Sequence, residues 1–389
     1  MTPRDPSPPA SPDPLPQGER VTIVPVTTKA DLDRFIRVPM NLNRNDPNWV
    51  SPLLLERQEA LSPKHNPLFR HLDYQFWLAV RDGRDVGRIS AQVDRLAPDP
   101  TAGYFGMIAA EDDPDVFAAL FAAAEAWLRA RGRATVLGPF NLSINEETGL
   151  LVDGFDTPPM LMMGHDPAYA GPRVEQQGYA KAKDLYAYIS GVPDFSPAIR
   201  RRLDRPAEGV VMRPVDMGRY DDEIATLVEI YNDAWAGNWG FTPLTQEEAA
   251  HLARSLKPIL HRRLIWFMEI DGERAAFGVM LHNINEAIAD LDGRLLPFGW
   301  ARLLWRLKTG RVKTSRVPLM GVRRKFARDP RGVLAPFLII DTLIREGRKL
   351  GIEQCECSWI LEDNRPMNHI LESFGARRYK TYRVYFKQL

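Results

Sequence analysis

The chain has 389 residues, of which 44% are hydrophobic and 26% charged, with 51 basic and 50 acidic side chains. This length suffices for two domains, because single hydrophobic cores rarely grow beyond about 250–300 residues. The net charge of +1 excludes a general nucleic-acid coat protein and an acidic disordered chain. Cys355 and Cys357, the two cysteines, lie one residue apart, which excludes a disulfide framework and indicates a reducing compartment.

The N-terminal segment is rich in proline, and no long apolar run follows it. Residues 1–19 contain seven prolines and lack both a basic and an apolar region, which is typical of a disordered tail and not of a signal peptide. No run of about 18 apolar residues is present, so we expect no transmembrane helix. We therefore predict a disordered tail over 1–20 and a cytoplasmic protein.

The first half of the chain shows alternating strand and helix signals. Asp82-Gly83 between two β-rich runs predicts a hairpin, and apolar spacing predicts a helix that ends at Gly132. In chain order we expect a strand at 21–26, a helix at 29–37, short helices over 39–71, hairpin strands at 76–80 and 86–93, a strand at 103–109, a helix at 115–131 and strands at 134–140 and 183–189.

The second half repeats this order, with a second hairpin turn at Asp271-Gly272. We expect strands at 210–215, 264–270, 274–281, 317–322, 353–360 and 378–386, and helices at 220–234, 333–350 and 367–374. The repeat predicts two α/β domains of one fold, at 21–190 and 210–389, joined by a linker over 191–209.

The repeated order resembles the GCN5-related N-acetyltransferase (GNAT) superfamily, whose domain is a mixed β-sheet splayed open at its centre and flanked by helices. The resemblance implies two tandem GNAT-like domains. In that superfamily a glycine-rich loop before a long helix holds the pyrophosphate of coenzyme A on backbone N–H groups and the helix dipole. The corresponding loop here is 327–332, in which Gly332 fits the pattern but Pro330 replaces the first glycine.

The resemblance places an acyl-CoA site in the second domain. Backbone N–H groups near Gly321 or Val322 would polarise the thioester carbonyl, and basic side chains would replace the missing glycine contacts. The implied set is Gly321, Val322, Arg323, Arg324, Arg328, Gly332 and Asn364. Leu371 stands where many members carry a tyrosine that protonates the thiolate. The first domain has acidic residues at the equivalent loop, from Glu111 to Asp115, so we expect no phosphate loop there.

A finer resemblance is to a group of two-domain bacterial acyltransferases that includes bacterial ceramide synthase. The segments that carry it are 46–50, 138–149, 163–167, 181–188 and 358–364. It implies transfer of a fatty acyl group from long-chain acyl-CoA to the amine of a sphingoid base, 3-oxosphinganine or sphinganine. The seven histidines show no ligand-like spacing, so we expect no metal.

Polar residues in two of these segments are candidates for the general base. Glu146 and Glu147 lie in a polar run between apolar flanks, where burial would raise a carboxyl pKa toward neutrality. His165 follows a Met/Leu run and would titrate near neutral pH. The alternatives are that the glutamates cap turns and that His165 is structural. Asn145, Trp239 and Phe241 are predicted to contact the acceptor, although the two aromatic residues fit a plain core equally well.

The segment 294–316 contains seven Lys/Arg, no acidic residue, and apolar residues at helical spacing with Trp300 and Trp305. A basic amphipathic helix with tryptophans is typical of contact with an anionic bilayer, which suggests the cytoplasmic face of the inner membrane. Packing on the first domain is the alternative.

Two other functions remain open from the sequence. Between Arg294 and Arg331 the sequence contains 12 Lys/Arg and one Asp, an excess of positive charge that would suit an aminoacyl-tRNA donor. The preferred interpretation nevertheless involves no nucleic acid. A non-catalytic acyl-CoA- or lipid-binding protein would account for the degenerate phosphate loop and the absent tyrosine.

Overall fold

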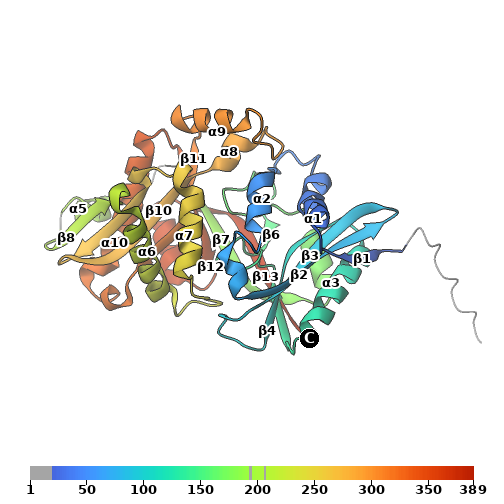
Figure 1. Ribbon diagram of the computed structural model, residues 1–389. Coiled ribbons are helices and arrows are strands. Elements are labelled where there is room, and N and C mark those ends of the chain that lie inside the picture. The colour runs from blue at the N-terminus through green and yellow to red at the C-terminus, as the bar shows by residue number, and fades with distance from the viewer. Residues whose placement is uncertain (1–19, 192–194, 206) are drawn as a thin grey trace, which may run out of the picture.

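The computed structural model describes residues 20–191, 195–205 and 207–389, in two halves that lie side by side (Figure 1). Residues 1–19 of the predicted tail, and 192–194 and 206 of the predicted linker, lie outside the described residues. The boundary predicted at 191–209 falls between the last strand of the N-terminal half and the first strand of the C-terminal half; the division into two domains at this point stays a prediction.

The N-terminal half contains seven strands and four α-helices among the described residues. Thr28 and Asp31 form a capping box at the start of α1, and Asp113 with Pro114 begins α3. The elements are β1 (Thr22–Pro25), α1 (Lys29–Leu42), α2 (Leu54–Ala60), η2 (Pro67–Arg70), β2 (Leu72–Arg81), β3 (Arg84–Asp94), β4 (Ala102–Ala110), α3 (Pro114–Arg129), β5 (Thr135–Gly138), β6 (Leu150–Asp153), α4 (Ala170–Gln176) and β7 (Ala180–Ser190).

The C-terminal half repeats the order and adds helices at its edges. Thr245 and Glu248 form a second capping box, and Asp329 with Pro330 begins α10. The elements are α5 (Pro197–Leu203), β8 (Val210–Pro214), η3 (Met217–Arg219), α6 (Tyr220–Trp235), α7 (Gln246–Leu256), η4 (Lys257–Ile259), η5 (Arg262–Leu264), β9 (Ile265–Ile270), β10 (Glu273–His282), α8 (Ile284–Ile288), α9 (Gly299–Lys308), β11 (Thr314–Val322), η6 (Arg324–Phe326), α10 (Pro330–Lys349), β12 (Gln354–Leu361), α11 (Arg365–Ser373) and β13 (Arg377–Gln388).

One sheet of 13 strands runs through both halves in the described part of the chain. Its order is β1-β2-β3-β4-β5-β13-β7-β12-β11-β10-β9-β8, with β6 paired to β13. The last strand of each half therefore pairs with the other half, since β13 lies beside β5 and β7 lies beside β12. This exchange makes the two mixed sheets continuous, a feature that the order of elements along the sequence did not predict.

Each half has two parallel strands that pair briefly and then separate. In the N-terminal half β4 and β5 pair from Ala102↔Thr135 to Tyr104↔Leu137, and in the C-terminal half β11 and β12 pair from Thr314↔Gln354 to Val317↔Cys357. Alternating side chains of each sheet enter two cores: α3 and α10 cover one face, whereas α1 and α6 cover the other. The splayed sheet predicted from the resemblance is thus present in both halves.

Several elements differ from the sequence expectations. The segment 294–316 holds one ten-residue helix, α9, and its last residues already belong to β11. The predicted linker contains α5, whose Leu203 is buried against the core beneath α10. The short elements α4, β6 and α8 and the 11-residue helix α7 were not predicted. Among the described residues, no helix is both long enough and apolar enough to cross a bilayer.

Candidate active site

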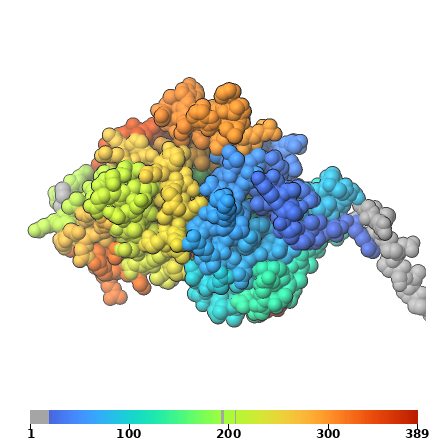
Figure 2. All heavy atoms as spheres, in the orientation of Figure 1, coloured from blue at the N-terminus to red at the C-terminus, as the bar shows by residue number. Residues whose placement is uncertain are grey.

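A cavity of about 950 Å³ lies between the two halves. This is near the upper end of the ~300–1,000 Å³ range of small-molecule sites. Helix α2 of the N-terminal half and α7 of the C-terminal half both line it, and they stand next to each other in Figure 1. The segment with α8 and α9 covers the top of the boundary between the halves, as Figure 2 shows, and α9 also contributes to the cavity wall.

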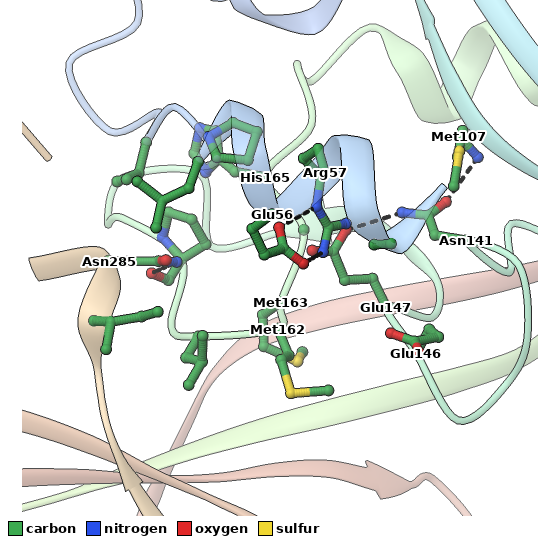
Figure 3. A pocket seen from close by; sticks show the side chains of 18 of the residues that line it. Glu56, Arg57, Met107, Asn141, Glu146, Glu147, Met162, Met163, His165 and Asn285 are labelled. Carbon is green, nitrogen blue, oxygen red and sulfur yellow. Dashed lines mark hydrogen bonds and ion pairs between the residues drawn. The ribbon is translucent and has the colours of Figure 1, made fainter. Parts of the chain in front are cut away.

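The loop 139–149, between β5 and β6, brings polar groups to this cavity. A bridge between Phe140 and Thr148 closes its base. The Asn141 side chain accepts a hydrogen bond from the Met107 N–H at 2.7 Å and donates one to the Glu147 carboxylate at 3.0 Å. The loop thereby enters the gap between the separating strands β4 and β5, and it holds Glu147 in a fixed place (Figure 3).

Glu146 and Glu147 both line the cavity but differ in their partners. No hydrogen bond or ion pair of the Glu146 carboxylate is found within the described residues, whereas Glu147 is bonded to Asn141. Glu146 keeps some exposure to the cavity while protein encloses it, and this burial raises its pKa to about 7. A carboxyl that is half ionised at neutral pH and has an unused lone pair can accept a proton there.

Further charges surround the glutamates. The Arg57 guanidinium binds the Glu56 carboxylate through two hydrogen bonds of 2.5 Å, close to Glu147 in Figure 3. Arg88 on β3 donates to the Phe35 carbonyl, and burial lowers its pKa to about 9. Asp166 accepts from the Leu151 N–H at 2.9 Å, and burial raises its pKa to about 7.

His165 forms a second candidate base together with Asp46. Its Nε2 lies 2.9 Å from an Asp46 carboxylate oxygen, and its side chain is 1% exposed. Burial lowers the His165 pKa, so the neutral ring donates its Nε2–H to Asp46. The other nitrogen, Nδ1, is buried without a partner among the described residues. Because Asp46 holds the Nε2–H side of the His165 ring, Nδ1 is left as a hydrogen-bond acceptor in the wall of the cavity.

The predicted acceptor residues divide between two places. Asn145 lines the large cavity, where it accepts from the Tyr231 hydroxyl at 2.7 Å and donates to the Thr242 carbonyl at 3.2 Å, so it links the loop to the C-terminal half. Trp239 lines a separate cavity of about 170 Å³. Phe241 packs against Tyr231 with ring centroids 6.0 Å apart. Neither aromatic residue is part of the large cavity's wall.

The gap between β11 and β12 opens toward the large cavity, and Trp235 and Trp359 stand at this opening. The Trp235 indole N–H donates to the Met320 carbonyl at 3.1 Å, and its ring packs edge-on against Trp359 at 5.8 Å. The Arg323 N–H donates to Ala275 on β10, so alternation directs the N–H of Gly321 to the same side.

The same alternation directs the N–H groups of Met320 and Val322 toward the gap. Of the two residues predicted to polarise the thioester, Val322 is therefore the one whose N–H faces the open edge.

Most of the predicted phosphate-binding arginines are paired with carboxylates of the chain. Arg323 lies 3.3 Å from Glu229, and Arg324 lies 3.2 Å from Asp233. Lys325 pairs with Glu273, and Arg331 pairs with Asp271 and Asp329. Arg328 is exposed and forms no ion pair within the described residues.

Gly332 and Asn364 have local structural roles. Gly332 is buried beneath the Phe326 carbonyl, where no Cβ would fit, and the Asn364 side chain caps α11 by accepting from the Met367 N–H.

A buried ion pair lies beneath the cavity, where β11 and β12 begin to separate. Arg316, 4% exposed, lies 3.5 Å from the Glu356 carboxylate and donates to the Ser358 hydroxyl at 2.7 Å and to the Leu161 carbonyl at 2.9 Å. Tyr379 and Ser358 both donate to Glu356. These bonds saturate the pair and tie the two halves together.

Several of these residues were missed in the sequence. Asp46 lies in a segment that carried the resemblance, but 119 positions separate it from His165, so spacing gave no signal. Arg57 lies in a segment without regular periodicity and Arg88 in a hairpin strand, and neither position indicated a place in the site. No group of three or more His, Cys, Asp or Glu residues in the described ranges is placed to hold a metal ion.

Comparison with known proteins gives two relatives that match more than nine-tenths of the chain. It is 59% identical over 375 residues to the bacterial ceramide synthase of Caulobacter vibrioides, covering 95% of this chain and 98% of that protein. It is 47% identical over 366 residues to protein YghO of Escherichia coli, covering 93% and 94%. No family model matches.

Two solved structures share the fold at low identity. A tandem GNAT protein from the clavulanic acid biosynthesis pathway gives a TM-score of 0.56 at 12% identity and covers 95% of this chain and 98% of its own. A GCN5-related N-acetyltransferase from Sphaerobacter thermophilus gives 0.54 at 13% identity, with coverages of 96% and 97%. The tandem GNAT fold expected from the sequence is confirmed.

Proposed function

The chain belongs to the family of bacterial ceramide synthase and is an acyltransferase enzyme of the GNAT fold, and from this premise we propose that it transfers a fatty acyl group from long-chain acyl-CoA to the amine of a sphingoid base, 3-oxosphinganine or sphinganine. The observation that carries the proposal is the cavity of about 950 Å³, which combines apolar walls from both halves with the poised carboxyl of Glu146. An amide with two long chains requires that combination.

In the proposed reaction the long-chain amine arrives as an ammonium ion and loses a proton to a base in the cavity. The neutral nitrogen attacks the thioester carbon and a new C–N bond forms. The C–S bond then breaks, the nitrogen loses its second proton to leave a neutral amide, and coenzyme A leaves as a thiolate that takes up that proton. The N–H of Val322, at the open edge of β11, is proposed to stabilise the developing oxyanion. Gly321, Arg323, Arg324 and Arg328 border the path proposed for coenzyme A, and Gly332 and Asn364 shape the ends of the adjoining helices.

Glu146 is proposed as the base, since its carboxylate has no competing partner and its pKa is about 7. Glu147, bonded to Asn141, is proposed to attract the ammonium ion and to hold the loop. His165 with Asp46 is the second proposed proton acceptor, at another part of the wall. Asn145 would face the acceptor, whereas Trp239 and Phe241 would support the loop from outside the cavity.

The segment 294–311 is proposed to contact the cytoplasmic face of the inner membrane. Four large apolar side chains are exposed there: Leu296, 69%; Phe298, 78%; Trp300, 51%; and Trp305, 49%. Arg294, Lys308 and Arg311 accompany them, a combination that suits the interface of an anionic bilayer. Trp300 also lines the cavity, so a lipid could pass from the bilayer toward the site.

The test is thiol release from palmitoyl-CoA by the full chain, with and without sphinganine or 3-oxosphinganine, with the product identified by mass. Thiol release that depends on the amine and yields the N-acyl product is expected. Thiol release without an amide, or an amide only with short acyl-CoA and short amines, would contradict the proposal. Flotation with vesicles containing phosphatidylglycerol tests the membrane surface. Phe298→Ser with Trp305→Ser is expected to reduce flotation, whereas Val211→Ser, an exposed apolar residue on β8, is the matched control.

A further inference from the structure

The large cavity has two apolar ends on opposite sides of its polar centre. In Figure 3, Glu56, Arg57 and Glu147 gather at the centre, while Met107 lies to one side of them and Asn285 to the other. Met107 belongs to β4 of the N-terminal half, and Asn285 belongs to α8 of the C-terminal half. The cavity therefore extends in two directions from the groups that are proposed to react.

The end in the N-terminal half, called here the β4 arm, is lined mainly by buried apolar residues: Ile36, Leu68, Met107, Ile108, Ala110, Phe117 and Ala170. Arg88, which pairs with Ala109 across β3 and β4, and Asp166 also belong to the cavity lining in this half. Met107 faces the core beneath α1, whereas Ile108 and Phe117 belong to the core beneath α3. The loop 139–149 fills the gap between β4 and β5 at residues 105–107. The β4 arm therefore runs past the loop along the last residues of β4 and has lining residues from the cores on both faces of the sheet.

The far end of the β4 arm is closed. The Tyr169 hydroxyl donates to the carbonyl of Ala110, the last residue of β4, at 2.8 Å. Phe117 on α3 is 1% exposed, and Ala110 is 3% exposed. A linear apolar chain that enters this arm meets its closed end, so the arm has room for a limited number of methylene groups.

The end in the C-terminal half, called here the α8 arm, is lined by Val279, Leu281, Ile284, Ile288, Leu303 and Leu319. Its boundary differs from that of the β4 arm. Trp300 and Leu304 continue the lining along α9, and Trp300 is 51% exposed. This arm therefore leads toward the exposed apolar side chains of 294–311.

We propose that the two arms separate the two alkyl chains of the reaction: the closed β4 arm binds the acyl chain and limits its length, and the α8 arm binds the tail of the long-chain amine, which enters from the membrane side. This inference rests on the proposed function. The acyl chain of a soluble thioester must be sheltered completely, which suits the closed arm. A bilayer lipid can keep the far end of its tail near the membrane, which suits the arm that reaches the surface.

The physical basis of the selectivity is the burial of methylene groups. Each methylene group that is buried in the arm raises the binding affinity of the chain about fourfold. A methylene group that meets the closed end adds no affinity and forces the surrounding side chains apart. Ile108→Phe shortens the β4 arm, and Phe117→Leu deepens it. Ile288→Phe, at the wall of the α8 arm, is the matched variant on the other side.

The experiment measures kcat/KM of the full-length variants over two series: acyl-CoA of 12 to 20 carbons with one amine, and amines of the same lengths with one acyl-CoA. Ile108→Phe is expected to lower kcat/KM for the longest acyl-CoA at least tenfold relative to the shortest, with the amine profile unchanged. Phe117→Leu is expected to move the acyl optimum to longer chains, and Ile288→Phe to shift only the amine profile.

Three outcomes would overturn the assignment: a shift of the amine profile by Ile108→Phe, a shift of the acyl profile by Ile288→Phe, or unchanged profiles in folded variants. Binding of non-reacting acyl-CoA thioethers, measured by calorimetry, separates this result from a failure of the proposed function. If the wild type forms no amide, the proposed function fails. The β4 arm assignment then stands or falls on whether Ile108→Phe weakens the longer thioethers selectively.

Discussion

The two halves build the same splayed pair of strands and fill the gap in different ways. In the N-terminal half the loop 139–149 folds back into the gap, because Asn141 binds the Met107 N–H and the Phe140 N–H donates to Phe105. In the C-terminal half no loop of the described residues enters the gap. The Trp235 indole N–H donates to the Met320 carbonyl, and the alternation of β11 directs the N–H of Val322, further along the strand, toward the gap. In the gap between β4 and β5 the inserted loop presents side chains to the cavity, whereas in the gap between β11 and β12 the backbone edge of β11 stays free.

This difference suggests a division of work between the halves. A thioester carbonyl needs backbone N–H donors, which the gap of the C-terminal half retains. The amine needs a base at a distance from that edge, and the loop that fills the N-terminal gap carries Glu146. The interlocked strands β7 and β13 then hold the two contributions in one rigid arrangement. The predictions below test this division.

The largest effect is expected from the loop. Glu146→Gln removes the proposed base and should lower kcat by about 10²–10⁴-fold. Because burial raises the Glu146 pKa to about 7, the wild-type rate should rise with pH through about 7 and level off above it, as the carboxylate forms. A pH profile of kcat/KM measures both points.

Glu147→Gln is the matched control for that experiment. An amide oxygen at this position still accepts the Asn141 hydrogen bond, so the loop keeps its anchor while the charge is lost. The loss in kcat should be smaller than for Glu146→Gln, and the acid limb near pH 7 should remain. If the acid limb instead disappears with His165→Gln and survives in Glu146→Gln, the base is the histidine.

A second prediction compares the two gaps by replacing one glycine beside each of them with alanine. A Cβ at Gly106 would overlap the carbonyl of Phe140, which belongs to the backbone of the inserted loop. Gly106→Ala should therefore lower the free energy of unfolding by about 2–3 kcal/mol and reduce activity by displacing the loop. Urea denaturation measures the change.

Gly321→Ala is the counterpart in the C-terminal half. Its Cβ would lie 3.0 Å from an atom of the Phe277 ring and 3.2 Å from the Ala234 Cβ, contacts that side chains can relax. The loss of stability should be under about 1 kcal/mol. Equal losses for the two substitutions would mean that the inserted loop is not a rigid part of the N-terminal gap.

A smaller effect concerns the contact between the halves. His71 of the N-terminal half lies 2.8 Å from Asp94 and 3.3 Å from Glu248 of α7, and hydrogen bonds to these two carboxylates raise its pKa to about 9. His71→Asn should cost about 1–2 kcal/mol in the free energy of unfolding near pH 6.

The sign of the pH dependence follows from the raised pKa. The contribution of His71 is complete below its unfolded pKa of about 6.5 and is lost as the pH rises through about 9. The stability difference between wild type and His71→Asn should therefore shrink between pH 6.5 and 9. Arg70→Gln removes the exposed pair with Glu247 and should cost under about 1 kcal/mol. A difference that stays constant up to pH 10 would contradict the protonated His71.

The elements with strong periodicity were predictable from the sequence, and those fixed by tertiary contacts were not. The hairpin turns at Asp82-Gly83 and Asp271-Gly272 predicted their strands, because the turn chemistry is local. The crossing of β13 to β5 was not predictable, since both strands follow the same pattern whichever neighbour they have. Helix α7 begins at a capping box, Thr245 and Glu248, which could have identified it.

The same distinction applies to the site. Glu146, Glu147, His165 and Asn145 were predicted as candidates, and the structure places all four on one cavity wall. Arg57 reaches that wall, and Asp46 reaches His165, only through the fold, so no spacing revealed them. The sequence showed the basic residues of 323–331 without most of their partners, because carboxylates of α6 and of the β9–β10 turn region, far away in the sequence, pair with Arg323, Arg324 and Arg331.

The smallest effect is predicted from the charges beside the N-termini of two equivalent helices, α3 and α10. Both begin with Asp-Pro, at Asp113 and Asp329, whose carboxylates accept the first N–H groups. A phosphate therefore finds those donors occupied in either half, and nearby cations must supply its binding. Arg328, exposed and without an ion pair in the described residues, can do so beside α10, whereas Glu111 and Asp112 oppose it beside α3.

Arg328→Gln should raise the KM for acyl-CoA about two- to fivefold, leave kcat nearly unchanged, and weaken the dependence of KM on ionic strength, because one exposed charge contributes about 1 kcal/mol or less. Arg84→Gln is the control in the N-terminal half, where the exposed arginine pairs with Glu111, and it should leave KM unchanged. An increase in KM for Arg84→Gln, with none for Arg328→Gln, would move the coenzyme A phosphates to the N-terminal half and reverse the proposed division of work.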